Sequence, residues 1–257
     1  VFGGTALVSR EYFAGGDGSQ GSPFLVADAE QFNKIRFFNH EHFRQTADFS
    51  FADKPWLSSA PSVSFVPVGH NLFGGGNFFG NYDGDGHRIS GLYVSNSAPN
   101  LAYSVDPTNL GPAGLFGVAK GASLRKLTLA APQVVSTMQT GGLVGLAALD
   151  GSKMTTIEDC KVEGGSVVGQ AGGGGTGYET GGLAGRVEGS LVNKSLSTAT
   201  VNGLDRVGGL VGASATGSEL RACGAVSTVN GNTELGGLAG CSEGLVYGCR
   251  FGGYLYG

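Results

Sequence analysis

Charge is scarce in this chain, and long apolar runs are missing. Only 14% of its 257 residues are Asp, Glu, Lys or Arg, the formal net charge is −4, and no block of like charge occurs. The sequence therefore predicts neither nucleic acid nor an anionic membrane surface as a partner. No stretch of 18 apolar residues and no basic-then-apolar leader occurs, so we expect no membrane insertion by this segment.

Motifs for metal, phosphate and peptidase chemistry are also missing. The four cysteines form no Cys-x-x-Cys pair, and the four histidines include no His-Glu-x-x-His pair; these residues are Cys160, Cys223, Cys241, Cys249, His40, His42, His70 and His87. Asp83-Gly-Asp85-Gly lacks the closing ligands of a calcium loop, so a tight turn is favoured. The glycine run 172–175 is not followed by Gly-Lys-Ser/Thr. We expect no catalytic residue, metal or cofactor in these residues.

A repeated pentapeptide dominates what is present. Ala113-Gly-Leu-Phe-Gly is followed by Gly-Gly-Leu-Val/Ala-Gly beginning at Gly141, Gly181, Gly208 and Gly236. The leucines of successive copies lie 28, 40, 27 and 28 residues apart, and the longest interval contains an added glycine-rich tract at 172–177. A recurrence at this period predicts a solenoid.

A second pattern follows each pentapeptide: apolar, two variable, apolar or small, one variable, apolar or small. Short segments with this alternation, bounded by glycine, predict strands with one buried face. A third apolar stretch follows in most turns, so we expect an all-β parallel β-helix with three strands per turn. A leucine-rich repeat is the alternative, but no Asn-and-helix segment follows the pattern. The copies are Ile89/Leu92/Val94, Leu124/Leu127/Leu129, Ile157/Cys160/Val162, Val192/Ser195/Ser197, Leu220/Cys223/Ala225 and Val246/Cys249/Phe251.

Glycine contributes 49 residues, which in a chain that is 40% hydrophobic indicates tight corners rather than disorder. We expect these glycines to supply left-handed dihedral angles where the coil turns. The last turn ends without a polar cap, so the sequence reads as a fragment of a longer protein.

Residues 1–82 are predicted to form an N-terminal cap and the first coil, and residues 83–257 the β-helix repeats, within one continuous domain. Thirteen of the fifteen phenylalanines and the single tryptophan lie in the first part. The capping box Asp28-Ala-Glu-Gln31 predicts a short α-helix from about Asp28 to Phe38. The alternation from Phe43 to Phe51 predicts an aromatic strand that, with the helix, covers the first coil, and we expect the aromatic residues to be core.

Several segments together resemble the GLUG-motif proteins: residues 13–19, 23–26, 29–32, 42–48 and 82–93, and the Gly-Gly-Leu-Val-Gly repeats. Members are similar in being secreted or surface-attached bacterial proteins, including adhesin-like proteins and the non-catalytic upstream regions of IgA1-specific zinc metallopeptidases. The resemblance implies a right-handed β-helix. It does not imply one activity, because the motif is a scaffold unit.

A glycan-cleaving β-helix would need clustered carboxylates on one outer face. The outward pairs instead alternate in sign from turn to turn, which favours a device for stacking in register. These pairs are Arg125-Lys126, Glu158-Asp159, Asn193-Lys194 and Arg221-Ala222.

Three of the cysteines, Cys160, Cys223 and Cys249, occupy one inward column, where parallel side chains point the same way and pack as small hydrophobes. We therefore expect four reduced thiols, at least three of them buried.

The sequence is best interpreted as a secreted or cell-surface bacterial module, the binding or presenting part of an adhesin-type protein whose partner is a surface protein or glycan of the host or a neighbouring cell. The alternatives are a substrate-positioning or spacer region of a secreted zinc metallopeptidase and, third, a glycan-cleaving enzyme. Loops that interrupt solenoids carry recognition, so the expected contact regions are 53–61, 95–111 and 169–180, with Trp56, Tyr103, Asp106 and Tyr178 as candidate ligand-binding residues.

Overall fold

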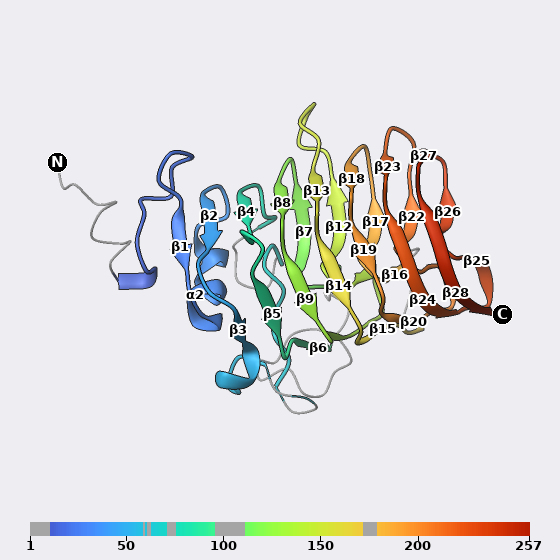
Figure 1. Ribbon diagram of the computed structural model, residues 1–257, viewed down its shortest axis with the longest axis horizontal. Helices are drawn as coiled ribbons and strands as arrows, with labels where there is room; N and C mark the ends of the chain where they lie inside the picture. Colours follow the sequence, from blue (N-terminus) through green and yellow to red (C-terminus); the bar gives the residue numbers. More distant parts are fainter. Residues whose placement is uncertain (1–10, 59, 61–62, 71–75, 96–110, 172–178) are drawn as a thin grey trace.

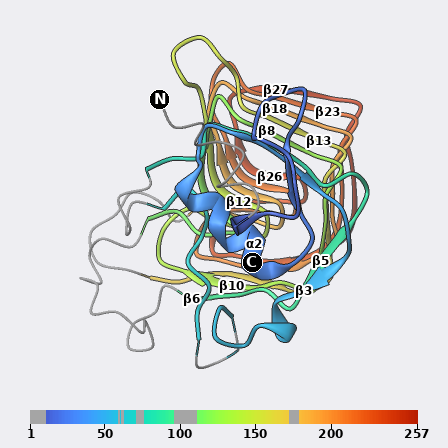
Figure 2. The ribbon, with the colours of Figure 1, turned by 90° about the vertical axis from the view of Figure 1, so that its left-hand side faces the viewer.

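The computed structural model describes residues 11–58, 60, 63–70, 76–95, 111–171 and 179–257, and these form a right-handed parallel β-helix. Successive turns stack along the long axis from the N-terminal to the C-terminal end (Figure 1). Seen from the N-terminal end, the chain circles clockwise as it recedes (Figure 2). The predicted fold class is confirmed. No helix in the described part of the chain is long and apolar enough to cross a membrane.

Four sheets enclose the interior. The first sheet, in spatial order, contains β1 (Phe24–Val26), β2 (His42–Gln45), β4 (Asn81–Asp83), β8 (Ser123–Arg125), β13 (Thr156–Glu158), β18 (Leu191–Asn193), β23 (Glu219–Arg221) and β27 (Leu245–Tyr247). The second contains β3 (Phe49–Ser50), β5 (Arg88–Ser90), β9 (Thr128–Ala130), β14 (Lys161–Glu163), β19 (Leu196–Ser197), β24 (Gly224–Asn230), β20 (Thr200–Asn202), β15 (Ser166–Gly169), β10 (Gln133–Ser136) and β6 (Tyr93–Ser95), with β28 (Arg250–Tyr256) beside β24. The third contains β11 (Thr140–Gly141), β16 (Thr180–Gly181), β21 (Asp205–Gly208) and β25 (Thr233–Gly236), and the fourth β26 (Ala239–Ser242), β22 (Val211–Ser214), β17 (Ala184–Val187), β12 (Val144–Ala148) and β7 (Phe116–Lys120).

A turn can therefore contain five strands rather than the three expected. The turn from β13 to β17, for example, passes once through the first sheet, twice through the second, and once each through the third and fourth. The additional two strands include most of the pentapeptide, whose glycines we expected to lie at corners. Gly181 ends β16 and Ala184 begins β17, with the buried Leu183 between them.

Buried side chains form straight columns through the stack, but the first predicted copy of the pattern is out of register. Tyr82 pairs with Leu124, and Ile89 pairs with Leu129 rather than with Leu124. Seven residues separate Tyr82 from Ile89, whereas five separate Leu124 from Leu129, because the Asp-Gly-Asp-Gly turn is two residues longer. The residues Ile89, Leu92 and Val94 instead extend from β5 to β6, and both of these strands belong to the second sheet.

The repeat glycines serve close backbone approach, not left-handed dihedral angles. A Cβ atom added to Gly185 would lie 2.5 Å from the Thr140 nitrogen and 2.7 Å from the Gly145 oxygen. The corner after the first sheet is instead left-handed without glycine in four turns: φ is 50°, 51°, 49° and 50° at Lys126, Asp159, Lys194 and Ala222. Each of these residues donates its backbone N–H to a carbonyl of the next turn, which offsets the strain. The expectation for the glycines was therefore wrong for the pentapeptides and confirmed at other glycines, such as Gly121, Gly165 and Gly189, whose φ angles are 53°, 82° and 50°.

A short helix closes the N-terminal end. Helix α2 (Ala29–Lys34) continues as the 3-10 helix η1 (Ile35–Phe37) and lies across the opening of the coil (Figure 2). Its capping box forms as predicted: Asp28 Oδ1 accepts from the Gln31 nitrogen at 2.8 Å, and Gln31 Oε1 accepts from the Ala27 nitrogen at 2.7 Å. Phe32 is fully buried against aromatic rings of the interior, including those of Tyr82 and Phe116, so this aromatic residue is core as expected.

The strand predicted for Phe43 to Phe51 is divided. Strands β2 and β3 belong to different sheets, and Phe51 begins the 3-10 helix η2 (Phe51–Asp53). The buried Gln45 stabilises the bend between β2 and β3, because its Nε2 donates to the Ala47 oxygen at 2.8 Å and its Oε1 accepts from the Tyr82 hydroxyl at 3.0 Å. These strands are part of the coil itself rather than a layer across it. Strand β4 spans the predicted boundary at residues 82 and 83.

Candidate functional site

Of the predicted ligand-binding residues, the structure describes Trp56. Its side chain is 61% exposed, and the Lys54 ammonium lies 5.1 Å from the ring centroid. The segment that carries it is fixed to strand β6 by Ser58, whose Oγ accepts from the Tyr93 nitrogen at 2.7 Å. Tyr103, Asp106 and Tyr178 lie outside the described residues, so their role stays a prediction.

A polar hollow, which the sequence reasoning missed, lies on the outer face of the first sheet near its N-terminal end. It encloses about 340 Å³. Outward side chains of β2, β4 and β8 form its floor, and the loop that precedes β1 forms a wall through Gln20, Gly21 and Pro23. The principal polar side chains of the floor are His42, Arg44, Asn81, Asp83, Ser123 and Arg125. The sequence signal that could have revealed the hollow is the alternation of buried and outward residues in β2 and β4, because every outward position carries a polar group.

The wall is braced by its own backbone. The Asp17 nitrogen donates to the Ser22 oxygen at 2.8 Å, and the His42 nitrogen donates to the Gly18 oxygen at 2.9 Å, which ties the loop to β2. Gly18 has φ +84°, and a Cβ atom there would lie 2.5 Å from the ring of Phe24. The loop therefore holds one shape over the hollow.

Four side chains of the floor form two contacting pairs, and Arg44 belongs to neither pair. Asn81 Nδ2 lies 2.8 Å from His42 Nδ1, and because an amide nitrogen only donates, Nδ1 accepts this hydrogen bond. Arg125 Nη2 lies 2.7 Å from Asp83 Oδ2. The side chain of Arg44 is exposed and makes no hydrogen bond or ion pair with the described part of the chain. Two guanidinium groups and one carboxylate give the floor a net charge of +1 with neutral histidine.

The charged side chains of the floor begin a longer column. In register along the first sheet lie Arg44, Asp83, Arg125, Glu158, Asn193 and Arg221. This column contains the alternating row that the sequence predicted, and Asn193 Nδ2 donates to Glu158 Oε1 at 3.0 Å. The hollow itself contains a single carboxylate, already paired, so it lacks the two carboxyl groups that glycoside hydrolysis uses.

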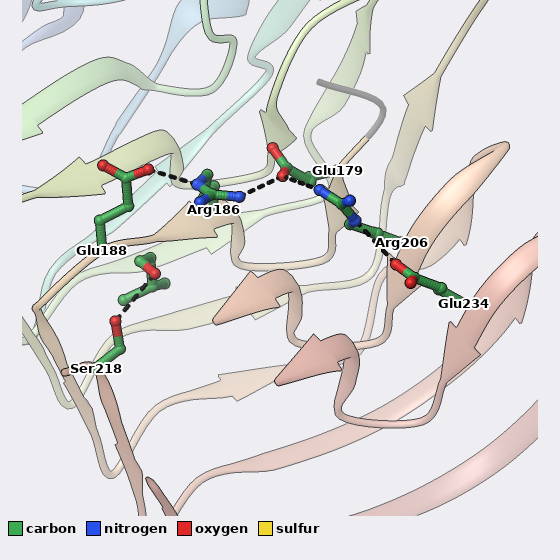
Figure 3. A network of polar contacts seen from close by, with 7 residues as sticks. Glu179, Arg186, Glu188, Arg206, Ser218 and Glu234 are labelled. Atoms are coloured by element: carbon green, nitrogen blue, oxygen red, sulfur yellow. Dashed lines mark hydrogen bonds and ion pairs between the residues drawn. The ribbon is translucent and has the colours of Figure 1, made fainter. Parts of the chain in front are cut away.

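A second polar cluster links three successive turns (Figure 3). Glu179 is buried, and its Oε1 accepts from Arg186 Nη1 at 2.6 Å and Arg206 Nη1 at 3.0 Å. Arg186 also pairs with Glu188 at 2.5 Å, and Arg206 with Glu234 at 2.8 Å. Burial opposes the charge of Arg186, but its hydrogen bond to Glu188 leaves its pKa above the ordinary value. The hydrogen bond to Glu234 raises the pKa of Arg206. Because every charged group of the cluster is paired and the two contacts of Arg206 join neighbouring turns, we regard the cluster as structural.

Three cysteines, Cys160, Cys223 and Cys249, form the predicted column, and all four cysteines are free. The Cys160 nitrogen donates to Ser195 Oγ at 3.2 Å, and the Cys223 nitrogen to Cys249 Sγ at 3.3 Å, which places these residues on adjacent turns. Burial raises the pKa of the Cys160 and Cys223 thiols to about 12. The expectation of at least three buried thiols was wrong, because Cys249 lies in the last described turn, which no further turn covers, and Cys241 is also part-exposed. Within the described ranges, no group of three His, Cys, Asp or Glu residues could hold a metal ion.

The class that fold and surface define is thus a parallel β-helix with a braced polar hollow on one outer face. No protein-family model matches the chain. It is 30% identical over 221 residues, 82% of its length, to halomucin of Haloquadratum walsbyi, and 29% identical over 154 residues, 59% of its length, to a "Putative Gly-rich membrane protein" of Evansella cellulosilytica. The chain spans only 2% and 16% of these curated relatives.

A solved structure shares the fold. The crystal structure of "a putative immunoglobulin A1 protease" from Bacteroides ovatus matches with a TM-score of 0.74 at 21% identity, over 95% of this chain and 70% of that one. At this identity the likeness shows the shared β-helix fold.

Proposed function

We propose that the chain is the binding or presenting part of an adhesin-type, secreted or surface-attached bacterial protein. The observation that carries this proposal is the braced polar hollow on an outer sheet face. A rigid stack of turns holds the hollow and the connecting segments in fixed positions, as expected of a recognition scaffold. The partner would be a protein or glycan on the surface of a host or neighbouring cell.

The comparisons support an extracellular or surface setting. One relative is named as a membrane protein, and the structural neighbour is named as a protease of immunoglobulin A1, an extracellular substrate. The resemblance to GLUG-motif proteins agrees with the same setting. The low charge and mixed column of the first sheet agree with a partner recognised by hydrogen bonds rather than by a large electrostatic field.

Saturable binding tests the proposal. The purified, fluorescently labelled chain is added to epithelial cells and to bacterial cells, with a 100-fold excess of unlabelled chain as competitor. We expect binding to at least one surface that the unlabelled chain displaces. Deleting residues 53–58, which carry Trp56, tests whether the predicted contact region takes part. Absence of displaceable binding on all surfaces and on protein and glycan arrays would contradict the proposal.

The second candidate is a substrate-positioning or spacer region of a secreted zinc metallopeptidase. The structural likeness to the protease-named chain of Bacteroides ovatus favours it. In that case the isolated chain is expected to bind immunoglobulin A1 and its hinge peptide without cleaving either. Surface plasmon resonance with immunoglobulin A2 as the matched control distinguishes this role from general surface binding.

A further inference from the structure

The polar hollow has the size and construction of a ligand site. Its volume of about 340 Å³ lies at the lower end of the range for small-molecule sites, about 300 to 1,000 Å³. Its floor consists of three neighbouring strands, and its wall is tied to β2 by the hydrogen bond from the His42 nitrogen to the Gly18 oxygen. The site is therefore preorganised, and little ordering would oppose binding.

Arg44 is the group in the hollow whose charge has no counterpart. It lies in register with Asp83, but the Asp83 carboxylate pairs with Arg125, on its other side. The other arginine of the same column, Arg221, contacts Glu219. Arg44 thus has its guanidinium in solvent at the edge of a polar surface, where it can form two parallel hydrogen bonds with a planar anion such as a carboxylate.

The remaining side chains suit hydroxyl groups. Gln20 and Asn81 carry amides, Ser123 a hydroxyl and Asp83 a carboxylate, so the hollow contains both donors and acceptors. A sugar hydroxyl both donates and accepts, and needs such a mixed set. Phe43 is only 1% exposed, and its ring packs against Phe24 and Phe78 in the interior, so the hollow offers hydrogen bonds rather than an exposed aromatic face.

The net charge of the hollow further restricts the class of ligand that would bind. A neutral sugar would leave Arg44 without a counter-charge, and a multiply charged phosphate or sulfate cluster would meet Asp83. One negative charge together with several hydroxyl groups fits the net charge of +1. We propose that the hollow binds a saccharide unit that carries one carboxylate, a uronic or sialic acid residue of a surface glycan, with Arg44 on the carboxylate. This inference rests on the proposed function and names its ligand class.

The test uses isothermal titration of the whole chain with a tetrasaccharide of alternating glucuronic acid and N-acetylglucosamine. The neutral counterpart, with each carboxyl group reduced to a primary alcohol, is titrated in parallel. We expect the acidic tetrasaccharide to bind and the neutral one to bind at least about tenfold more weakly, a difference of about 1.4 kcal/mol. Equal binding of both, or binding of neither, overturns the assignment.

Variants locate the site. Arg44→Ala is expected to weaken binding of the acidic tetrasaccharide at least about tenfold, and Arg44→Lys to restore part of it, because an ammonium keeps the charge but loses the bidentate geometry. Arg221→Ala is the matched control: it removes an arginine from the same column five strands further along, outside the hollow, and should leave binding unchanged. Arg44 is exposed, so circular dichroism of these variants should match the wild type. Unchanged affinity of Arg44→Ala would overturn the proposal.

The cell-binding assay separates this inference from the proposed function. If the chain binds cells displaceably but binds no acidic tetrasaccharide, the ligand assignment is wrong and the proposed function stands. If cell binding is also absent, the proposed function fails independently. Displacement of the tetrasaccharide by an equal concentration of a glutamate-rich peptide would show that the hollow selects a carboxylate and not a saccharide, which contradicts the assignment.

Discussion

Replacing Gly185 by alanine tests why the repeat is rich in glycine. A Cβ atom at this position would lie 2.5 Å from the Thr140 nitrogen and 2.7 Å from the Gly145 oxygen, both backbone atoms that cannot rotate away. The strands must therefore separate, which typically costs about 1 to 3 kcal/mol. The Thr140 nitrogen also donates to the Glu179 oxygen at 2.9 Å, and disturbing this bond adds about 1 kcal/mol.

The unfolded state acts in the opposite direction, because alanine restricts it by about 0.4 to 1 kcal/mol relative to glycine. Gly185→Ala should thus lower the free energy of unfolding by about 1 to 3.6 kcal/mol. Gly252→Ala is the control: Gly252 has no atom within 4 Å of the added Cβ and no left-handed φ, so this variant should be unchanged or slightly more stable. Urea titration followed by circular dichroism measures both. If the two variants shift the midpoint in the same direction by the same amount, the close-approach argument is wrong.

Further predictions concern pH, charge and thiols. Burial and then the charge of Arg36 lower the pKa of His70 from 6.5 to about 4, so the stability present above pH 6.5 should fall by about 3 kcal/mol as the pH drops to 4, and His70→Gln should remove this component of the pH titration. Glu179→Gln should lower the free energy of unfolding by about 1 to 3 kcal/mol, whereas Glu188→Gln, at an exposed partner, should change it by less than about 1 kcal/mol. In native protein the two part-exposed thiols should alkylate first, and mass spectrometry after alkylation in denaturant without reductant should show four modified cysteines, including Cys160 and Cys223; two modified cysteines would reveal a disulfide. Elemental analysis should find no stoichiometric zinc, and incubation with proteins and glycans should give no cleavage products.

The fold could be predicted from the sequence because each turn of a solenoid contains the same pattern of buried residues. Leu124, Ile157, Val192 and Leu220 recur at one position of each turn, and the register of the first sheet places them on adjacent strands. The errors arose where one turn differs in length from the next. The Asp-Gly-Asp-Gly turn adds two residues before Ile89, and a pattern matched by spacing alone slips there.

The candidate site was less accessible to sequence reasoning. Arg44 and Arg125 are 81 residues apart, and their proximity depends on the register of β2, β4 and β8 rather than on any local motif. The pentapeptide glycines were misinterpreted for a related reason. A glycine required by a neighbouring turn looks the same in sequence as one required by its own dihedral angles, and only the position of the neighbour, as at Gly185 and Thr140, separates the two causes.

The hydrogen bonds between turns run along the long axis of the stack, which has a mechanical consequence (Figure 1). Under a pull along this axis, the interfaces between turns lie in series, so the weakest one opens first and the others follow separately. A turn of 28 residues releases about 95 Å of extended chain when it unravels, far more than the spacing of about 4.8 Å that it occupied. The turns joined by Glu179, Arg206 and Glu234 should open last. Such a module would lengthen in steps under tension. Each step would dissipate mechanical work and so limit the peak force at the point where the module is attached.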